Sequence, residues 1–287
     1  MADEDGTSVP AVVSASVVLL RDAVPHGVSD GAGGPPSDGG DVEVLLLERH
    51  LDSDFAGGAY VFPGGKVDAA DRALDPARWT GRPLSWWAPR LGVATDDEAL
   101  GLLVCAVRET FEESGILLAT NEDGTLLSGD RLASSSFREA RRRLAERGAH
   151  WDWRGWLEDE AITLDLGALA LVAWWVTPQG MHRRFDTRFF AATLPVGQVA
   201  AHDDVETTGL AWLRPEEALA RQARGAAVII FPTRRILAAL SGHHAARDVW
   251  AAALAGSDAV ARIEPTIVVV DGTTMVQHPF EDAPSLP

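Results

Sequence analysis

The chain has 287 residues, of which 46% are hydrophobic and 23% charged, so it can bury a sizeable core and is neither fibrous nor wholly disordered. Asp and Glu outnumber Lys and Arg by 42 to 25, which gives a formal net charge of −17. This charge repels nucleic acids and anionic membrane surfaces, and we expect neither as a partner. The acidic N-terminus, the lack of an apolar run of about 20 residues and the single cysteine favour a cytoplasmic protein.

The first part of the chain is predicted to be rich in strands. Two short runs of Val and Leu, at 11–21 and 42–49, predict strands that pair as neighbours. The Gly- and Pro-rich stretch 25–41 between them is expected to be a flexible loop. Residues 57–68 then predict a short strand that runs into a Gly-rich turn, and residues 98–114 predict a helix.

The rest of the chain continues as a mixture of helices and strands. We expect a helix at 134–148, strands at 168–176, 185–194 and near 205–213, helices from Pro215, from Pro232 and over 243–255, and a final strand at 264–271. There is no internal repeat and no long linker. One mixed α/β domain over 1–287, with a helical C-terminal elaboration over 215–287, therefore fits better than two domains.

Three glutamates share one face of the helix predicted at 98–114. Glu109, Glu112 and Glu113 stand at positions i, i+3 and i+4, where like charges repel unless they are solvated or compensated by a cation. Hard carboxylate oxygens suit Mg²⁺ or Mn²⁺, and Arg108 is placed to brace Glu112. Taken alone, such a cluster is more often a solvated helix face.

A glycine turn upstream adds context to these carboxylates. Gly64 and Gly65 follow the short strand, and paired glycines allow the backbone to turn sharply and approach a ligand or metal. Together, turn and helix resemble the box of the Nudix hydrolases, G-x5-E-x7-R-E-U-x-E-E-x-G-U, in which U is apolar. Gly65 starts the box, and residues 108–116, RETFEESGI, complete it.

The box departs from the family pattern in its spacing. Arg108 stands 43 positions after Gly65, where the family has 14, which indicates an insertion that we place at 69–97. Counted back from Arg108, the first glutamate of the box falls on Leu100, and Thr110 takes an apolar position. The open alternatives for the missing carboxylate are Asp68, Asp97 and Glu98.

A box split in this way resembles the coenzyme A diphosphatase branch of the superfamily, as does the run RFDTRFF that begins at Arg184. The resemblance implies an α/β/α sandwich with a mixed sheet, an insertion inside the box and added C-terminal helices. It also implies a Mg²⁺- or Mn²⁺-dependent pyrophosphohydrolase of coenzyme A or acyl-CoA. The alternatives are an NADH, dinucleotide or nucleotide-sugar pyrophosphatase, and a non-catalytic module that senses a nucleotide. The expected partner is a small nucleotide-type substrate, and a homodimer is left open.

The resemblance also implies roles for single residues. The metal ligands would be Glu109, Glu112, Glu113 and the carbonyl of Gly64. Catalysis would fall to Glu112 and Glu113, to Arg108 as the group that orients them, and to Glu206 as a loop base, ahead of Asp203 and Asp204. The expected substrate-binding residues are Gly65 and Lys66 of the turn together with Arg184 and Arg188. The two arginines, with Arg183, alternate with apolar residues near a predicted sheet edge, where they are candidates for phosphate contact.

Three further features carry alternatives. Trp79, Trp86 and Trp87 make the insertion either a packed surface excursion or a lid that stacks on adenine. The arginine-rich run at 138–147 is either a contact for a nucleotide phosphate or a solvated helix face, and the solvated face is favoured. Cys105 lies on the core side of its helix and is expected to be a small buried hydrophobe.

Overall fold

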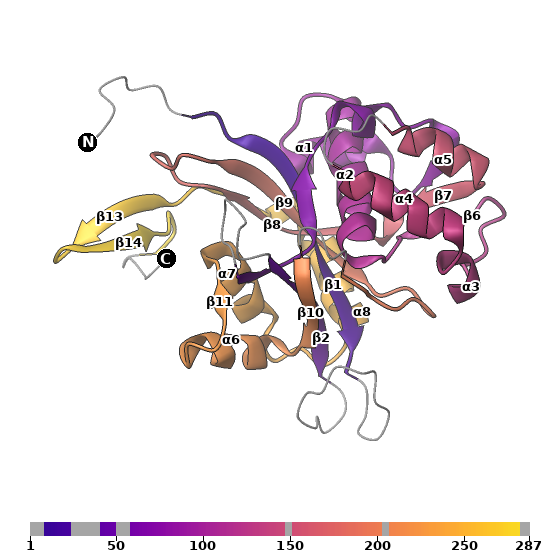
Figure 1. Ribbon diagram of the computed structural model, residues 1–287. Coiled ribbons are helices and arrows are strands. Elements are labelled where there is room, and N and C mark those ends of the chain that lie inside the picture. The colour runs from indigo at the N-terminus through magenta and orange to yellow at the C-terminus, as the bar shows by residue number, and fades with distance from the viewer. Residues whose placement is uncertain (1–8, 24–40, 50–57, 147–150, 203–206, 282–287) are drawn as a thin grey trace.

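The computed structural model describes residues 9–23, 41–49, 58–146, 151–202 and 207–281 (Figure 1). The predicted flexible loop lies outside these residues, apart from Asp41. The strands are β1 Val12–Asp22, β2 Val42–Arg49, β3 Ala59–Val61, β4 Gly64–Lys66, β5 Trp79–Thr80, β6 Ala119–Asn121, β7 Ile162–Asp165, β8 Ala170–Val176, β9 Phe185–Thr193, β10 Thr207–Leu213, β11 Val228–Ile229, β12 Arg262–Ile263, β13 Thr266–Val270 and β14 Thr273–Gln277. The α-helices are α1 Leu84–Leu91, α2 Asp96–Ser114, α3 Gly129–Leu132, α4 Ser135–Ala145, α5 Trp153–Asp159, α6 Pro215–Ala223, α7 Phe231–Leu240 and α8 Ala246–Gly256.

Within the described residues, nine strands form one mixed sheet. Seven of them follow the order β11-β3-β2-β1-β9-β8-β12, while β10 pairs with β2 and β4 pairs with β1. The first two predicted strands are antiparallel neighbours, as expected. β1 also runs parallel to β9, from Val12 opposite Phe185 to Leu20 opposite Thr193. Because β9 lies between β1 and β8, it is an interior strand of the sheet.

Alternation along the strands divides the core into two layers. Val17 and Leu19 of β1 face a cluster that includes residues of α1, α2, α4 and α5, whereas Val18 and Leu20 face a cluster with residues of α6, α7 and α8. Figure 1 shows α2, α4 and α5 on one side of the sheet and α6 and α7 on the other. The expected α/β/α sandwich with a mixed sheet is therefore confirmed.

The insertion packs tightly against this body. It contains the 3-10 helices Ala69–Ala73 and Pro76–Arg78, the strand β5 and the helix α1. Trp87 is 1% exposed and meets the ring of Phe190 edge-on, with centroids 5.9 Å apart. β5 pairs with β7 in a second, small sheet. The interpretation of a packed excursion is thus the better one, because the tryptophans are used for packing.

The C-terminal part contains the three expected helices but more strands than predicted. β11 and β12 join the large sheet, and the predicted final strand is β13, which pairs with β14 in a hairpin. Asp271 and Gly272 form its turn with φ of 50° and 78°, the backbone of a type I′ turn. In the described part of the chain, no helix is long and apolar enough to span a membrane.

Candidate active site

The helix α2 that carries the three glutamates is fixed at both ends. Thr95 caps its N-terminus by accepting from the backbone N–H of Glu98, and the Glu98 carboxylate accepts from the backbone of Thr95 in return. At the other end Gly115 adopts φ 73° and donates to the carbonyl of Phe111. Glu98 is therefore a capping residue, and the helix begins at Asp96, two residues before the predicted start.

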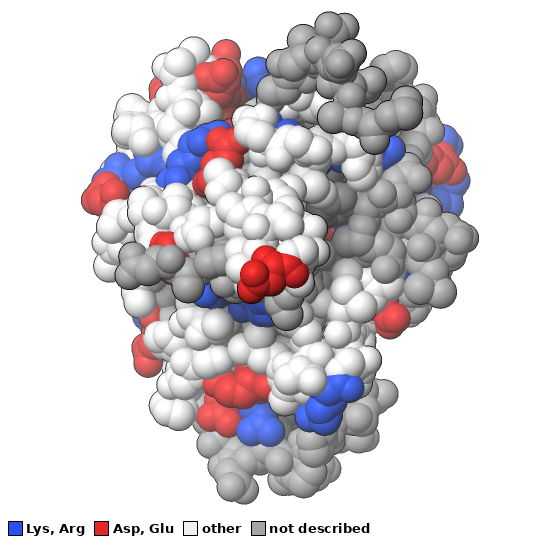
Figure 2. Space-filling model, turned by 90° about the vertical axis from the view of Figure 1, so that its left-hand side faces the viewer, with Lys and Arg blue, Asp and Glu red and all other residues white. Residues whose placement is uncertain are grey.

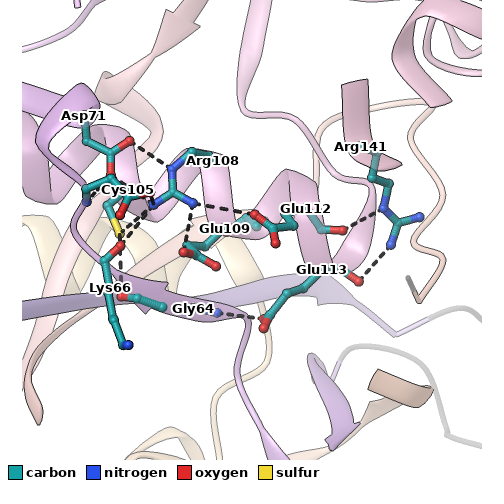
Figure 3. A network of polar contacts seen from close by, with 12 residues as sticks. Gly64, Lys66, Asp71, Cys105, Arg108, Glu109, Glu112, Glu113 and Arg141 are labelled. Carbon is teal, nitrogen blue, oxygen red and sulfur yellow. Dashed lines mark hydrogen bonds and ion pairs between the residues drawn. The ribbon is translucent and has the colours of Figure 1, made fainter. Parts of the chain in front are cut away.

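The two glycines let β4 lie closely between β1 and α2. A Cβ on Gly64 would be 2.5 Å from the carbonyl oxygen of Ala15, and one on Gly65 would be 2.4 Å from the carboxylate of Glu109. The N–H of Gly64 donates to Glu113 Oε2 at 2.9 Å (Figure 3). The glycine turn and the carboxylate helix, separated in sequence by the insertion, are thus in direct contact.

Arg108 joins the turn, the insertion and the helix. Its Nε and Nη2 donate to the two carboxylate oxygens of Asp71, each at 2.9 Å, and Nη2 also donates to the carbonyl of Lys66 at 3.0 Å. Nη1 lies 2.9 Å from Glu109 Oε1 and 3.6 Å from Glu112 Oε2 (Figure 3). Burial alone lowers the pKa of Arg108, but Glu109 and Asp71 raise this pKa above its ordinary value. The guanidinium therefore stays charged.

Asp71 is the carboxylate that the sequence analysis did not find. It is fully buried and stands six residues after Gly65, the distance at which the Nudix box has its first glutamate. The interpretation that this position falls on Leu100 is wrong, since Leu100 belongs to the apolar core. Asp68 is mainly exposed and 3.7 Å from Arg108, while Asp97 is exposed. When the Nudix box is counted forward from Gly65, its first carboxylate falls on Asp71. The residues inserted into the box therefore follow Asp71.

Three of the predicted metal ligands lie on α2, and the fourth, Gly64, contacts Glu113. Glu109 and Glu112 line a cavity with Gly64 and Gly65, while Glu113 is buried and is not among the lining residues. Among the described residues, no three His, Cys, Asp or Glu side chains converge as a metal site. The oxygen donors have the chemistry that Mg²⁺ or Mn²⁺ requires and come from one helix face. The three glutamates fit such an ion once their carboxylates rotate away from Arg108 and from the backbone N–H of Gly64.

Arg141 supports the end of the same helix. Its Nε donates to the carbonyl of Glu112 and its Nη2 to the carbonyl of Glu113, both at 2.8 Å. These are carbonyls of the last helical turn, where a cation also opposes the negative end of the helix dipole. Arg142 and Arg143 of the same run behave as predicted, because they form exposed ion pairs with Glu139. Arg147 lies outside the described residues.

The cavity has a volume of about 1340 Å³, and its lining combines charged residues of the glycine turn and α2 with apolar residues of β8, α7 and the C-terminal hairpin. Residues 69–97, and hence the tryptophans of the insertion, do not line it. Its cationic lining includes Arg49, Lys66 and Arg183, and Lys66 is the only lysine in the sequence. Glu206, Asp203 and Asp204 lie outside the described residues.

Arg184 and Arg188 are not brought to this cavity. Arg184 is buried and donates to the carbonyls of Val9 and Thr177. Arg188 is buried over the ring of Trp174 and donates to the carbonyl of Leu91 at 2.7 Å. Both guanidinium groups are therefore held by backbone carbonyls of neighbouring segments and do not line this cavity, and their expected role in binding substrate stays a prediction.

Cys105 is a buried residue of α2, as predicted. Its Sγ lies 3.2 Å from the carbonyl oxygen of Lys66, and burial raises the pKa of the thiol well above its ordinary value. The thiol therefore stays protonated and has the character of a small core side chain.

Comparison with known proteins decides the family. The family model described as the NUDT19 Nudix domain matches residues 88–234, just over half of the chain. The chain belongs to this Nudix family. A Nudix hydrolase structure from Alicyclobacillus acidocaldarius aligns with a TM-score of 0.64 at 27% identity, covering 84% of this chain and 96% of that one. The expected fold family is therefore confirmed.

Two curated relatives of this Nudix chain carry the name "Acyl-coenzyme A diphosphatase NUDT19". The Gallus gallus protein is 34% identical over 247 residues, which cover 72% of this chain and 62% of the relative. The Homo sapiens protein is 33% identical over 223 residues, which cover 64% of this chain and 56% of the relative. The chain thus spans less than two thirds of the length of these relatives.

Proposed function

We propose that this Nudix protein is a divalent-metal-dependent pyrophosphohydrolase that cleaves the diphosphate of coenzyme A or acyl-CoA. The observation that carries the proposal is the cavity, which is lined by Glu109, Glu112 and the glycine turn and also by apolar residues of β8, α7 and the C-terminal hairpin. The names of the relatives support the substrate class. A cytoplasmic location, a homodimer and a single domain stay predictions from the sequence.

We assign the metal to the carboxylates of α2. Glu109, Glu112 and Glu113 would hold Mg²⁺ or Mn²⁺, with the carbonyl of Gly64 as a further ligand. When bound, such an ion neutralises charge on the diphosphate oxygens and makes a bound water more acidic. Removing the metal should therefore remove activity without unfolding the chain.

The protein's own residues position the reaction. Arg108, clamped by Asp71, orients the carboxylates of Glu109 and Glu112. Gly65 leaves room for the diphosphate to approach the backbone, and Lys66 stands beside it in the cavity as a cation for the phosphates. The proposed general base is Glu206, with Asp203 and Asp204 as alternatives.

The decisive experiment is a metal-supplemented assay with identification of both products. Candidate substrates are coenzyme A, octanoyl-CoA, dephospho-coenzyme A, NADH, ADP-ribose, diadenosine polyphosphates and sugar nucleotides. We expect the highest kcat/KM for coenzyme A or its acyl ester, with adenosine 3′,5′-bisphosphate and a phosphopantetheine as products. Equal cleavage of dephospho-coenzyme A would show that the 3′-phosphate is not recognised.

Variants of the helix carboxylates test the catalytic assignment. Glu112→Gln and Glu113→Gln should each lower kcat by about 100-fold, since each removes a charge that acts on the transition state. Glu158→Gln, on an exposed position of α5, is the matched control and should retain the wild-type rate. Wild-type activity in excess EDTA would contradict the metal assignment. Cleavage of a sugar nucleotide or dinucleotide without cleavage of coenzyme A would reject the proposed substrate class. Nucleotide binding without any cleavage would reject the proposal that the protein is an enzyme.

A further inference from the structure

We propose that the apolar end of the cavity binds the acyl chain of the substrate, and that the C-terminal hairpin β13–β14 forms one of its walls. This inference rests on the proposed function, because it assumes that the diphosphate lies at the carboxylates. It adds a specificity site for an acyl thioester, built from segments far in sequence from the Nudix box.

The floor of the cavity connects its two ends. Lys66, Ser14, Thr187 and Trp175 are successive register partners across β4, β1, β9 and β8, and all four line the cavity. Three strand spacings separate the first from the last, which is about 14 Å. The row begins beside the glycine turn and ends among apolar side chains. A substrate with a charged diphosphate and an apolar tail fits this row when its diphosphate lies near Lys66 and its tail near Trp175.

The hairpin supplies a wall that is attached to the body. Ile267 and Val276 are directly opposite each other on β13 and β14, and both line the cavity. Val276 is 7% exposed and belongs to the second core cluster, while the ring of His278 lies 5.4 Å from the ring of Trp175. The side of the molecule that carries the hairpin faces the viewer in Figure 2, where mostly uncharged surface surrounds a central acidic patch with basic side chains just below it.

The other wall comes from β11 and the start of α7. Val228 lines the cavity and is 61% exposed, and Ile267 on the hairpin is 40% exposed. Exposed aliphatic side chains on both sides of one cavity lose unfavourable contact with water when an apolar ligand covers them. The apolar lining thus favours a ligand that ends in a hydrocarbon chain.

Three of the aromatic residues that line the cavity are too buried to stack on adenine. Trp175 and Phe231 are 5% and 7% exposed, and their rings meet edge-on with centroids 5.6 Å apart. Phe189 is also 7% exposed. Stacking on a purine needs an accessible ring face, and these rings are nearly covered by their neighbours. The accessible apolar groups named above are aliphatic, which fits an acyl chain.

A matched pair of variants on β13 tests the inference. Ile267 and Val270 are 40% and 41% exposed, and because they are three residues apart they face opposite sides of the strand. Ile267→Gln should lower the ratio of kcat/KM for octanoyl-CoA to that for coenzyme A by about tenfold. Val270→Gln should leave this ratio at the wild-type value. The loss in Ile267→Gln should be smaller for acetyl-CoA than for octanoyl-CoA.

A second variant tests the opposite wall. Val228→Gln should also lower the ratio of kcat/KM for octanoyl-CoA to that for coenzyme A. This variant leaves the hairpin unchanged, so its result does not depend on whether the hairpin tolerates substitution. An unchanged ratio in both wall variants, with coenzyme A still cleaved, would overturn the inference and leave the proposed function standing. An equal loss for coenzyme A and octanoyl-CoA would also overturn it, since the site would then bind a part common to both. Failure of the wild type to cleave either compound would instead reject the proposed function.

Discussion

Arg108 is nearly buried, and its charge is compatible with that position because Asp71 binds it through two hydrogen bonds. A buried ion pair adds little folding stability compared with an apolar replacement of similar volume. Removal of one partner, however, leaves an uncompensated charge in a medium of low polarity, which is strongly destabilising. The same pair orients two carboxylates that line the cavity. Asp71 therefore affects both stability and catalysis, although it does not itself line the cavity.

Asp71→Asn should lower the free energy of unfolding by about 3–5 kcal/mol, the range for breaking a buried pair. It should also lower kcat, because the guanidinium no longer holds Glu109 and Glu112 in place. Urea denaturation and steady-state kinetics measure the two effects. Asp97→Asn is the control: this exposed carboxylate in the first turn of α2 should contribute about 1 kcal/mol or less. An equal loss of unfolding free energy in both variants would show that the buried pair of Asp71 and Arg108 contributes no more than an exposed carboxylate.

The residue scale also shows where sequence reasoning succeeds and fails. The glutamates of α2 and the glycine turn are recognisable because each pattern is local. Asp71 is missed when the box is counted back from Arg108, since the inserted residues shift that count onto the core residue Leu100. The sequence favours a sheet edge for Arg184 and Arg188, but Arg184 precedes β9 and Arg188 belongs to it, and β9 is an interior strand, which a local pattern does not reveal.

At the scale of elements, the insertion acts as part of the core. Trp87, Ala88 and Leu91 of α1 are buried in the cluster that also contains α2, and Leu91 accepts the hydrogen bond from Arg188. Removing residues 72–95 would therefore expose the face of α2 that packs against α1, and α2 is the helix that carries the glutamates. A point substitution separates packing from substrate binding more cleanly than such a deletion.

Trp87→Ala should lower the free energy of unfolding by about 3–5 kcal/mol, because it removes a large buried side chain and leaves a cavity. KM for the best substrate should stay at the wild-type value, since Trp87 does not line the substrate cavity. Arg82→Ala in the same insertion removes an exposed cation over Trp86 and should cost about 1 kcal/mol or less. A higher KM in Trp87→Ala at unchanged stability would restore the interpretation of the insertion as a lid.

The hairpin shows how a short signal can be overlooked. The apolar run at β13 predicts a strand, but β14 mixes Thr and Gln with apolar residues and lacks such a run. The Asp271-Gly272 dipeptide between them is a strong hairpin signal, since both residues adopt positive φ. Read together, the turn and the preceding strand would have predicted the return strand, though not its contact with the cavity.

At the scale of the whole molecule, the net charge of −17 opposes the folded state through self-repulsion. Added salt of any kind screens this repulsion, whereas a divalent ion that binds the carboxylates of α2 stabilises the fold by a further amount that depends on its concentration and affinity. Both effects raise the melting temperature, so only a comparison at matched ionic strength separates them.

The melting temperature should therefore rise with NaCl, and it should rise further with MgCl₂ or MnCl₂ at the same ionic strength. At a free ion concentration 100 times the Kd, specific binding adds about 2.7 kcal/mol of stability. Glu112→Gln should keep the response to NaCl and lose most of the extra response to the divalent ion, because it removes one of the proposed ligands. Glu158→Gln should keep both responses. If wild type and Glu112→Gln respond alike to the divalent ion, the stabilisation is general screening, and the assignment of the metal to α2 is wrong.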